Sequence, residues 1–173
     1  QASSVPVILY NVPSRTAVDM LPETVARLAR LPRVAGIKEA VASMQRIREL
    51  VAQCPPGFGL LSGDDASSRE AIRNGATGVI SVTGNVAPQL MSQMVAAAQA
   101  KDDGRAAELD ARLVGLHQSL FLEANPIPVK WALQRMGMMR GHLRLPLTPL
   151  AQRHHAAVEA ALAQAGIPLA AAA

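Results

Sequence analysis

Short apolar runs alternate with longer amphipathic stretches along the first hundred residues. Four runs rich in Val, Ile and Leu are apolar at consecutive positions, as is typical of parallel strands buried on both faces. They lie at residues 5–12, 34–39, 58–62 and 78–83. Helical stretches follow them and begin near residues 21, 43, 66 and 86. This repeated strand–helix unit predicts a parallel sheet with right-handed crossovers.

The second part of the chain has a helical pattern without strands. An amphipathic helix is predicted over 105–122, and Asn125–Pro126 and Thr148–Pro149 each combine an N-cap residue with a Pro at the first helical position. We therefore divide the chain into a strand–helix region, residues 1–101, and a helical region, residues 102–173.

Polar residues follow each predicted strand, at its carboxyl end. They are Tyr10–Asn11, Lys38–Glu39, Gly63–Asp64–Asp65 and Ser81–Thr83. In a (β/α) barrel these ends form one rim, where active sites are built. An open sheet usually binds its ligand at one crevice with a Gly-rich phosphate turn, and the sequence contains neither GxGxxG nor GxxxxGK[ST]. The pattern favours a barrel, of which four strands are half of the usual eight.

Composition and charge exclude two classes of partner. The chain is 50% hydrophobic, and we find no apolar run of about 18 residues, so a membrane span is not expected. The net charge is +4, but the basic residues are scattered, and aromatic residues make up only 2% of the chain. Nucleic-acid binding is therefore not expected either, because no basic run is interleaved with aromatic residues.

The single cysteine and the N-terminus suggest where the protein works and how much of it is present. Cys54 has no partner for an internal disulfide or a multi-cysteine metal site, which fits a reducing cytoplasm. Residues 1–4 carry neither an initiator Met nor the start of a signal peptide. We expect the chain to be a fragment of a longer protein.

Lys38 is the first candidate for chemistry. An ammonium within an apolar strand is costly, and if it is buried its pKa falls, leaving a neutral amine that can form a Schiff base with a carbonyl. Gly36 and Ala40 would share its face of the sheet and leave room for a substrate. The alternative is a strand-end lysine whose ammonium reaches solvent. Lys101 and Lys130 are weaker candidates, in a charged loop and beside a tryptophan.

Two further residues lie near the predicted position of Lys38. Tyr10 ends the neighbouring strand, where its phenol could serve as a general acid and base; otherwise it is an amphipathic core residue. Arg15, in the loop that follows, could clamp a carboxylate with its two-pronged guanidinium; otherwise it is an exposed loop residue. Asp64–Asp65 could form an acid/base pair, but after Gly63 they more plausibly cap the following helix.

Several segments together resemble the dihydrodipicolinate synthase family. They are YNVPSRT at 10–16, GIKEA at 36–40, SGDD at 62–65, GVISVT at 78–83 and NPIPVKW at 125–131. Their order and spacing agree with the family over residues 6–166. The wider superfamily of pyruvate-dependent class I aldolases includes N-acetylneuraminate lyase. Its other members keep the tyrosine and lysine but usually lack the arginine that corresponds to Arg15.

This resemblance implies a lyase that makes 4-hydroxy-tetrahydrodipicolinate in lysine and diaminopimelate biosynthesis. Lys38 would form an imine with pyruvate, whose enamine attacks aspartate semialdehyde, and Tyr10 would move the protons. Arg15 would hold the carboxylate of the semialdehyde. Ile80 would contact the pyruvate moiety through its backbone, and Gly63 would leave space beside the imine. The resemblance implies no metal and no organic cofactor.

The resemblance also implies how the rest of the protein is built. The four strands would be strands 5–8, the C-terminal half of a (β/α)8 TIM barrel, in a cytoplasmic enzyme that is commonly a homotetramer. The absent half would carry a threonine, a second tyrosine and the site where lysine inhibits. Ala17 stands where the family commonly has Gly. Two alternatives remain, a related aldolase for another aldehyde or keto-sugar acid and an inactive half-barrel that serves as a binding module.

Overall fold

A computed structural model describes residues 4–170 of the chain, so Gln1, Ala2 and Ser3, which entered the prediction about the N-terminus, lie outside the described residues. The chain forms two compact units. The first comprises residues 1–81 and 98–101, and the second comprises 82–97 and 102–173. The structure therefore groups residues 82–97 with the helical unit, whereas the sequence division at residue 101 places them with the strands.

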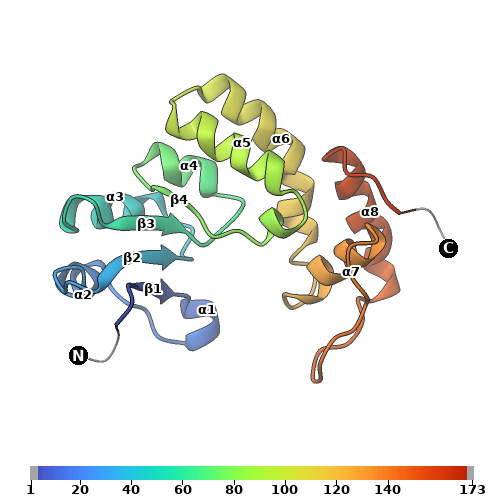
Figure 1. Ribbon diagram of the computed structural model, residues 1–173, viewed down its shortest axis with the longest axis horizontal. Helices are drawn as coiled ribbons and strands as arrows, with labels where there is room; N and C mark the ends of the chain where they lie inside the picture. The colour runs from blue at the N-terminus through green and yellow to red at the C-terminus, as the bar shows by residue number, and fades with distance from the viewer. Residues whose placement is uncertain (1–3, 171–173) are drawn as a thin grey trace. The chain divides into compact units, whose positions relative to one another are not determined.

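The first unit contains a four-stranded parallel sheet (Figure 1). Its strands are β1 (Val7–Asn11), β2 (Val34–Glu39), β3 (Gly59–Ser62) and β4 (Gly78–Val79). They are hydrogen-bonded in the order β1-β2-β3-β4, and all three neighbouring pairs are parallel. The predicted parallel sheet is confirmed, and the bounds of β2 agree with the predicted ones.

The fourth strand is much shorter than predicted. The sequence predicted a strand over 78–83, but β4 ends at Val79. Its partner β3 ends at Ser62, which pairs with Val79, and one more hydrogen bond joins the Ile80 N–H to the Ser62 carbonyl at 2.9 Å. Beyond this point the chain leaves the strand conformation and forms a 3-10 helix, η1 (Thr83–Asn85).

Helices of the first unit cover one face of the sheet. They are α2 (Pro22–Leu28), α3 (Met44–Gln53) and α4 (Ser68–Arg73), while a short helix α1 (Pro13–Thr16) follows β1. Helix α3 contacts α2, α4 and β3. Ile37 and Leu60 are buried on this face, at 0% and 4% exposed. Removing these aliphatic side chains from water stabilises the packing of helix on sheet.

The helical unit is built on the long helix predicted from the sequence. After α5 (Pro88–Gln99), helix α6 (Asp103–Ser119) packs against α8 (His155–Gln164), which also contacts α7 (Ile127–Arg135). Asp102 caps α6, because its side chain accepts a hydrogen bond from the Arg105 N–H at 3.0 Å. The core of this unit consists of aliphatic side chains that are fully buried, among them Leu113, Leu116, Val158 and Leu162.

Two predicted helix starts are wrong. Asn125 does not cap α7, whose N-cap residue is Pro126 and whose first residue is Ile127. The Thr148–Pro149 pair does not open a helix either, since α8 begins only at His155, after a 3-10 turn, η2 (Gln152–His154). Next to that pair, Ala151 has extended dihedral angles, and its N–H donates to the Glu123 carboxylate at 3.2 Å.

Candidate functional site

The strand register places four of the five predicted site residues on one face of the sheet. Tyr10 pairs with Lys38, Lys38 with Leu61, and Leu61 with Gly78. Paired residues of neighbouring strands share a face, and so do residues two apart along a strand. Gly63 and Ile80 therefore lie on the same face as Tyr10 and Lys38, at the carboxyl ends of the strands. We call this the Lys38 face.

Lys38 and Tyr10 are in direct contact. The Lys38 Nζ lies over the Tyr10 ring, 4.5 Å from its centroid, a distance at which ammonium and aromatic ring attract each other. Lys38 is half-buried, and Tyr10 is 47% exposed. The prediction that these two residues end neighbouring strands is confirmed. The pair leaves the amine reachable for a small carbonyl compound and puts a phenol beside it.

Gly63 leaves the space next to Lys38 open. A Cβ at this position would lie 3.0 Å from the Lys38 Cε and 3.0 Å from the Ala40 Cβ. Both distances are tighter than almost all real Cβ contacts. A glycine at this position therefore leaves the aliphatic stem of Lys38 uncrowded. Ala40 also borders the Gly63 position, which agrees with the prediction that Ala40 shares the face of Lys38.

Arg15 and Ile80 border the same end of the sheet. Arg15 is exposed on α1, where its N–H donates to the Val12 carbonyl at 2.9 Å. Among the described residues no hydrogen bond or ion pair joins Arg15 to Lys38 or Tyr10. Ile80 directly follows β4 and is 42% exposed. The binding roles of both residues stay predictions.

The opposite face carries two buried polar residues to which the sequence reasoning assigned no role. Asn11 and Glu39 follow Tyr10 and Lys38 and pair with each other in the register. They are 2% and 1% exposed. Burial raises the pKa of the Glu39 carboxyl above its usual value, although hydrogen bonds from Val41 and Asn11 oppose this. The period of two would have placed both residues behind the Lys38 face, but only the structure shows them paired.

Other polar residues serve local structure. The Asp64 carboxylate accepts a hydrogen bond from the Ser67 N–H at 2.9 Å, in the turn before α4. The expected helix cap is wrong, because the N-cap residue of α4 is Ser67 and no side chain among the described residues caps this helix. In the helical unit, His117 is 5% exposed, and its Nδ1 lies 2.9 Å from the Thr83 hydroxyl. The two residues are 34 positions apart, so the structure and not the local sequence shows this contact.

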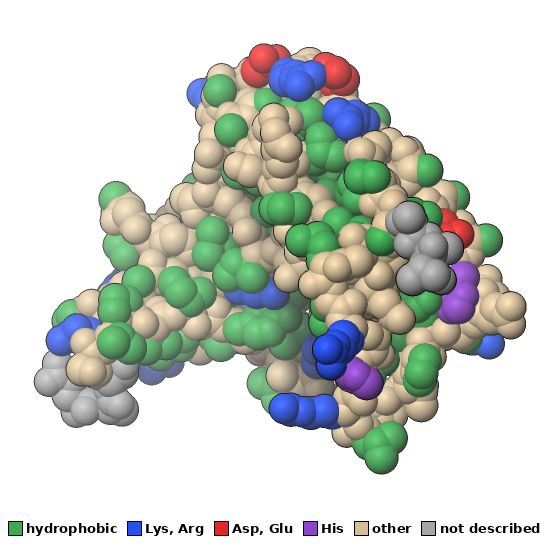
Figure 2. All heavy atoms as spheres, turned by 45° about the vertical axis from the view of Figure 1, so that its right-hand side comes forward, with side chains coloured by type: hydrophobic (Ala, Val, Ile, Leu, Met, Phe, Trp, Pro, Cys, Tyr) green, Lys and Arg blue, Asp and Glu red, His purple; other side chains and the backbone are tan. Residues whose placement is uncertain are grey.

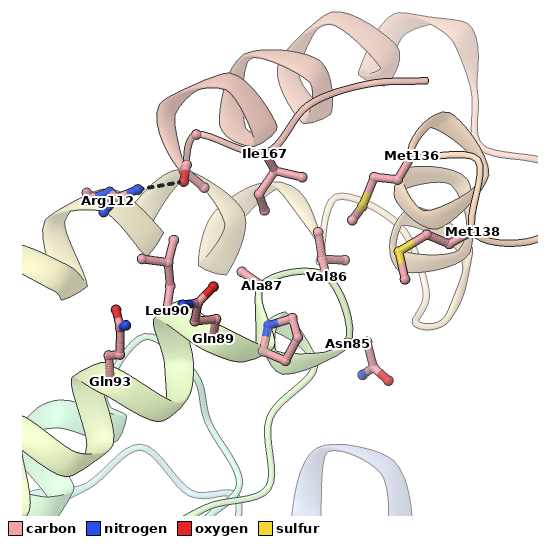
Figure 3. Close-up of a pocket in the computed structure, with 13 residues that line it drawn as sticks. Asn85, Val86, Ala87, Gln89, Leu90, Gln93, Arg112, Met136, Met138 and Ile167 are labelled. Carbon is pink, nitrogen blue, oxygen red and sulfur yellow. Dashed lines mark hydrogen bonds between the residues drawn. The ribbon is translucent and has the colours of Figure 1, made fainter. Parts of the chain in front are cut away.

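The helical unit contains a pocket of about 450 Å³ (Figure 3). Its wall combines apolar side chains, including Leu90, Met138 and Ile167, with polar ones. The Arg112 guanidinium is already bound at this wall, donating to the Ala165 carbonyl at 3.1 Å. None of the predicted site residues lines the pocket.

The surface agrees with the scattered charge of the sequence. On the face shown in Figure 2, Lys and Arg side chains lie apart in small groups, among hydrophobic and neutral ones. Within residues 4–170, no helix is long and apolar enough to cross a membrane.

The fold and the Lys38 face together define an α/β protein with a candidate imine-forming lysine at the carboxyl end of a parallel sheet. A sequence model of the dihydrodipicolinate synthetase family matches residues 1–165. The chain belongs to this family.

Similar proteins share this chain's sequence over nearly its whole length. The 4-hydroxy-tetrahydrodipicolinate synthases of Azoarcus sp. (strain BH72) and Methylococcus capsulatus are each 53% identical over 167 residues, which is 96% of this chain. The chain spans 57% of the length of these curated relatives.

Solved structures show the same fold. The dihydrodipicolinate synthase of Acinetobacter baumannii, described as chloride-inhibited and complexed with pyruvate, is 46% identical and superposes with a TM-score of 0.93. That of Aquifex aeolicus is 38% identical, also with a TM-score of 0.93. In both cases the match covers 96% of this chain and 57% of the other.

Proposed function

We propose that this chain carries the pyruvate-activating part of a 4-hydroxy-tetrahydrodipicolinate synthase, a lyase that condenses pyruvate with aspartate 4-semialdehyde. The observation that carries the proposal is the Lys38 Nζ held 4.5 Å from the centre of the Tyr10 ring on an open sheet face. Relatives of that name at 53% identity, and a similar structure complexed with pyruvate, support it.

The first steps form an imine and then an enamine. Once the Lys38 ammonium has given a proton to water, its amine adds to the C2 carbonyl of pyruvate, and the Tyr10 hydroxyl gives a proton to the departing oxygen, which leaves as water. The protonated imine withdraws electrons from the neighbouring methyl group, which loses a proton to the Tyr10 phenolate to give the enamine. Because the imine nitrogen itself accepts these electrons, the proposed route uses neither a metal nor an organic cofactor.

The next steps join the two substrates. The enamine carbon attacks the aldehyde carbon of aspartate semialdehyde, a C–C bond forms, and the aldehyde oxygen takes up a proton from the Tyr10 hydroxyl. The substrate's own amine then attacks the imine carbon, closes the ring and displaces Lys38. Arg15, on the exposed helix α1, would hold the carboxylate of the semialdehyde through paired hydrogen bonds. The Ile80 backbone would contact the pyruvate moiety, and Gly63 would keep the space beside the imine open.

We propose further that the four strands are strands 5–8 of a (β/α)8 barrel, within a strand–helix region 1–101 followed by a helical region 102–173. The outer edge of β1 has no strand partner among the described residues, and Ile8 and Tyr10 on the Lys38 face are 46% and 47% exposed. Four further strands would pair this edge and enclose the face. The full enzyme would act in the cytoplasm as a homo-oligomer.

Trapping the imine tests the proposed function. The full-length protein is incubated with pyruvate and reduced with borohydride, and the added mass is located by peptide mass spectrometry. We expect the adduct on Lys38, its loss in Lys38→Ala, and its retention in Lys101→Ala, the matched control. A well-folded protein without the adduct would overturn the proposal.

Arg15→Ala separates the two substrates. This variant should still form the pyruvate adduct, because Arg15 is assigned to the aldehyde. It should turn over aspartate semialdehyde more slowly, with a KM raised by about tenfold, the scale of a lost charge-assisted hydrogen bond. If the parent protein uses sugar-derived aldehydes as well as it uses aspartate semialdehyde, the result would instead favour a related aldolase.

A further inference from the structure

Behind the Lys38 face lies a cluster of four side chains, Asn11, Asp19, Glu39 and Arg46, which we call the Glu39 network. The Asn11 Nδ2 donates to the Glu39 Oε1 and Oε2 at 3.1 and 3.0 Å and to the Asp19 Oδ1 at 2.9 Å. The Arg46 guanidinium donates to both Asp19 oxygens, at 2.8 and 2.5 Å, and lies 3.6 Å from the Glu39 Oε2.

A carboxylate buried to 1% exposure would be costly without partners. Both Glu39 oxygens are bonded: Oε1 also accepts from the Val41 N–H at 2.7 Å. Asn11 is equally engaged, because its Oδ1 accepts from the Met20 N–H at 2.9 Å. The network therefore has one well-defined arrangement, since each of these donors already has an acceptor.

Three segments that carry site residues meet at this network. Asn11 is the residue after Tyr10 on β1, and Glu39 is the residue after Lys38 on β2. Asp19 and Met20 belong to the loop that follows α1, the helix of Arg15. The side-chain bonds to Asn11 thus join the ends of β1 and β2 and the loop behind α1.

Glu39 has no direct access to the reacting atoms in this arrangement. Successive residues of a strand point to opposite faces, so Glu39 lies on the far side of the sheet from the Lys38 amine. Its influence on the reaction must pass through the backbone of β1 and β2. An error of about 1 Å in the placement of a reacting group can cost about 100-fold in rate.

We propose that Glu39 is a positioning residue, which through Asn11 holds Lys38 and Tyr10 in the geometry for imine formation and through Asp19 and Arg46 anchors the loop behind Arg15. This inference rests on the proposed function. It divides the network into two sets of contacts, or arms, one for each substrate. The Asn11 arm, the bonds between Asn11 and Glu39, supports the reaction with pyruvate. The Asp19–Arg46 arm, the ion pair between these two residues, supports binding of the aldehyde.

Glu39→Gln tests the pyruvate arm in the full-length protein. Glutamine keeps the shape of Glu39 but places an amide N–H₂ where Oε2 accepts from Asn11, so two donors face each other. We expect the rate of imine formation, measured by borohydride trapping on Lys38, to fall by about tenfold or more, within the range of such misplacement. The fraction of folded protein should stay at the parent level. Glu23→Gln, the same change on the exposed start of α2, should behave like the parent protein.

Asp19→Asn tests the other arm. It weakens the ion pair with Arg46 and leaves the Glu39–Asn11 contact in place. Imine formation with pyruvate should stay within about twofold of the parent rate, while the KM for aspartate semialdehyde should rise by about fivefold or more, as expected when about 1 kcal/mol of a charged contact is lost. A purely structural cluster would not separate the two substrates in this way.

The outcomes distinguish this inference from the proposed function. If the parent protein forms no imine, the proposed function fails; if parent and folded Glu39→Gln form it equally fast, only the role of Glu39 fails. Glu39→Asp keeps the charge and should give an intermediate rate. The inference would be overturned if both Glu39 variants unfold. It would also be overturned if Asp19→Asn slows imine formation and the use of aspartate semialdehyde equally, because the network would then serve the fold as a whole.

Discussion

At the scale of single residues, Ala17 shows how a local conformation departs from what its side chain prefers. It closes α1 with φ 55° and ψ 17°, in the left-handed region, and its N–H donates to the Pro13 carbonyl at 2.9 Å. A Cβ in this region costs about 1–2 kcal/mol. Since the family resemblance places glycine here, the chain accepts strain in the loop that carries Arg15.

Ala17→Gly should stabilise the protein. Relief of the left-handed strain exceeds the entropy that glycine loses on folding, so the free energy of unfolding should rise by about 0.5–1 kcal/mol. Ala52→Gly, at an exposed position within α3, should lower it by about 0.5–1 kcal/mol. Denaturant unfolding measures both, and a decrease in both variants would contradict the strain argument.

The buried carboxyl of Glu39 should make the free energy of unfolding depend on pH. Desolvation by burial raises its pKa, against hydrogen bonds from Val41 and Asn11 and the charge of Arg46, while Asp19 adds to the rise. The folded state then holds the proton more tightly than the unfolded chain does. The contribution of Glu39 to the free energy of unfolding is therefore largest below its unfolded pKa of about 4.3 and is lost as pH rises through the folded pKa.

This direction is checked by measuring the free energy of unfolding of the parent protein and of Glu39→Gln between pH 4 and pH 7. The free energy of the parent minus that of the variant should fall as pH rises, because only the parent has the titrating carboxyl. A difference that grows with pH would show that the Asn11 and Val41 bonds outweigh desolvation, and a constant one would show that the two effects cancel; either result would contradict the raised pKa.

At the scale of elements, local caps decide where some helices begin and distant contacts decide the others. Helix α6 begins where its sequence provides an N-cap, Asp102. Helix α3 likewise begins after Ser43, which accepts from the Arg46 N–H at 3.3 Å. The start of α8 instead follows Ala151, an extended residue whose N–H donates to the distant Glu123.

Asp102→Ala should therefore destabilise the helical unit by about 1 kcal/mol, the usual cost of losing an N-cap side chain. Asp102→Asn, which keeps the accepting oxygen, should cost less than half of that. Thermal or denaturant unfolding followed by circular dichroism measures the difference. If alanine and asparagine destabilise equally, the charge of Asp102 matters rather than its hydrogen bond.

At the scale of the whole molecule, the sheet has an edge and a face that nothing described covers. Within residues 4–170, β1 pairs only with β2, and Val7 and Ile8 on β1 are 37% and 46% exposed. Exposed apolar strands at an open edge promote association with other chains. The proposed barrel would remove both features.

Ile8→Lys should therefore reduce self-association of the 173-residue chain, because it places a charge on the open face beside the free edge. Val18→Lys, at a position 68% exposed outside the strands, is the matched control and should leave association unchanged. Sedimentation velocity or light scattering over a concentration series gives the answer. Equal effects of the two changes would mean that charge alone, and not the sheet edge, controls association.

The sequence by itself determined the elements whose signals are local. Strand β2 has its predicted bounds, and helix α3 begins one residue after its predicted start, because the apolar run and the helical pattern lie within the segments themselves. The neighbourhood of Tyr10 and Lys38 also followed, because parallel strands place their carboxyl ends at one edge. The family resemblance then supplied the reaction.

The tertiary structure alone decided the features that depend on partners far along the chain. Strand β4 ends at Val79 because β3 ends at Ser62, and Asn11 meets Glu39 across 28 residues. A strand needs a neighbour to bond to, and a buried carboxylate needs donors, whereas the local pattern specifies neither. The sequence therefore located the candidate amine, and the folded chain revealed what holds it in place.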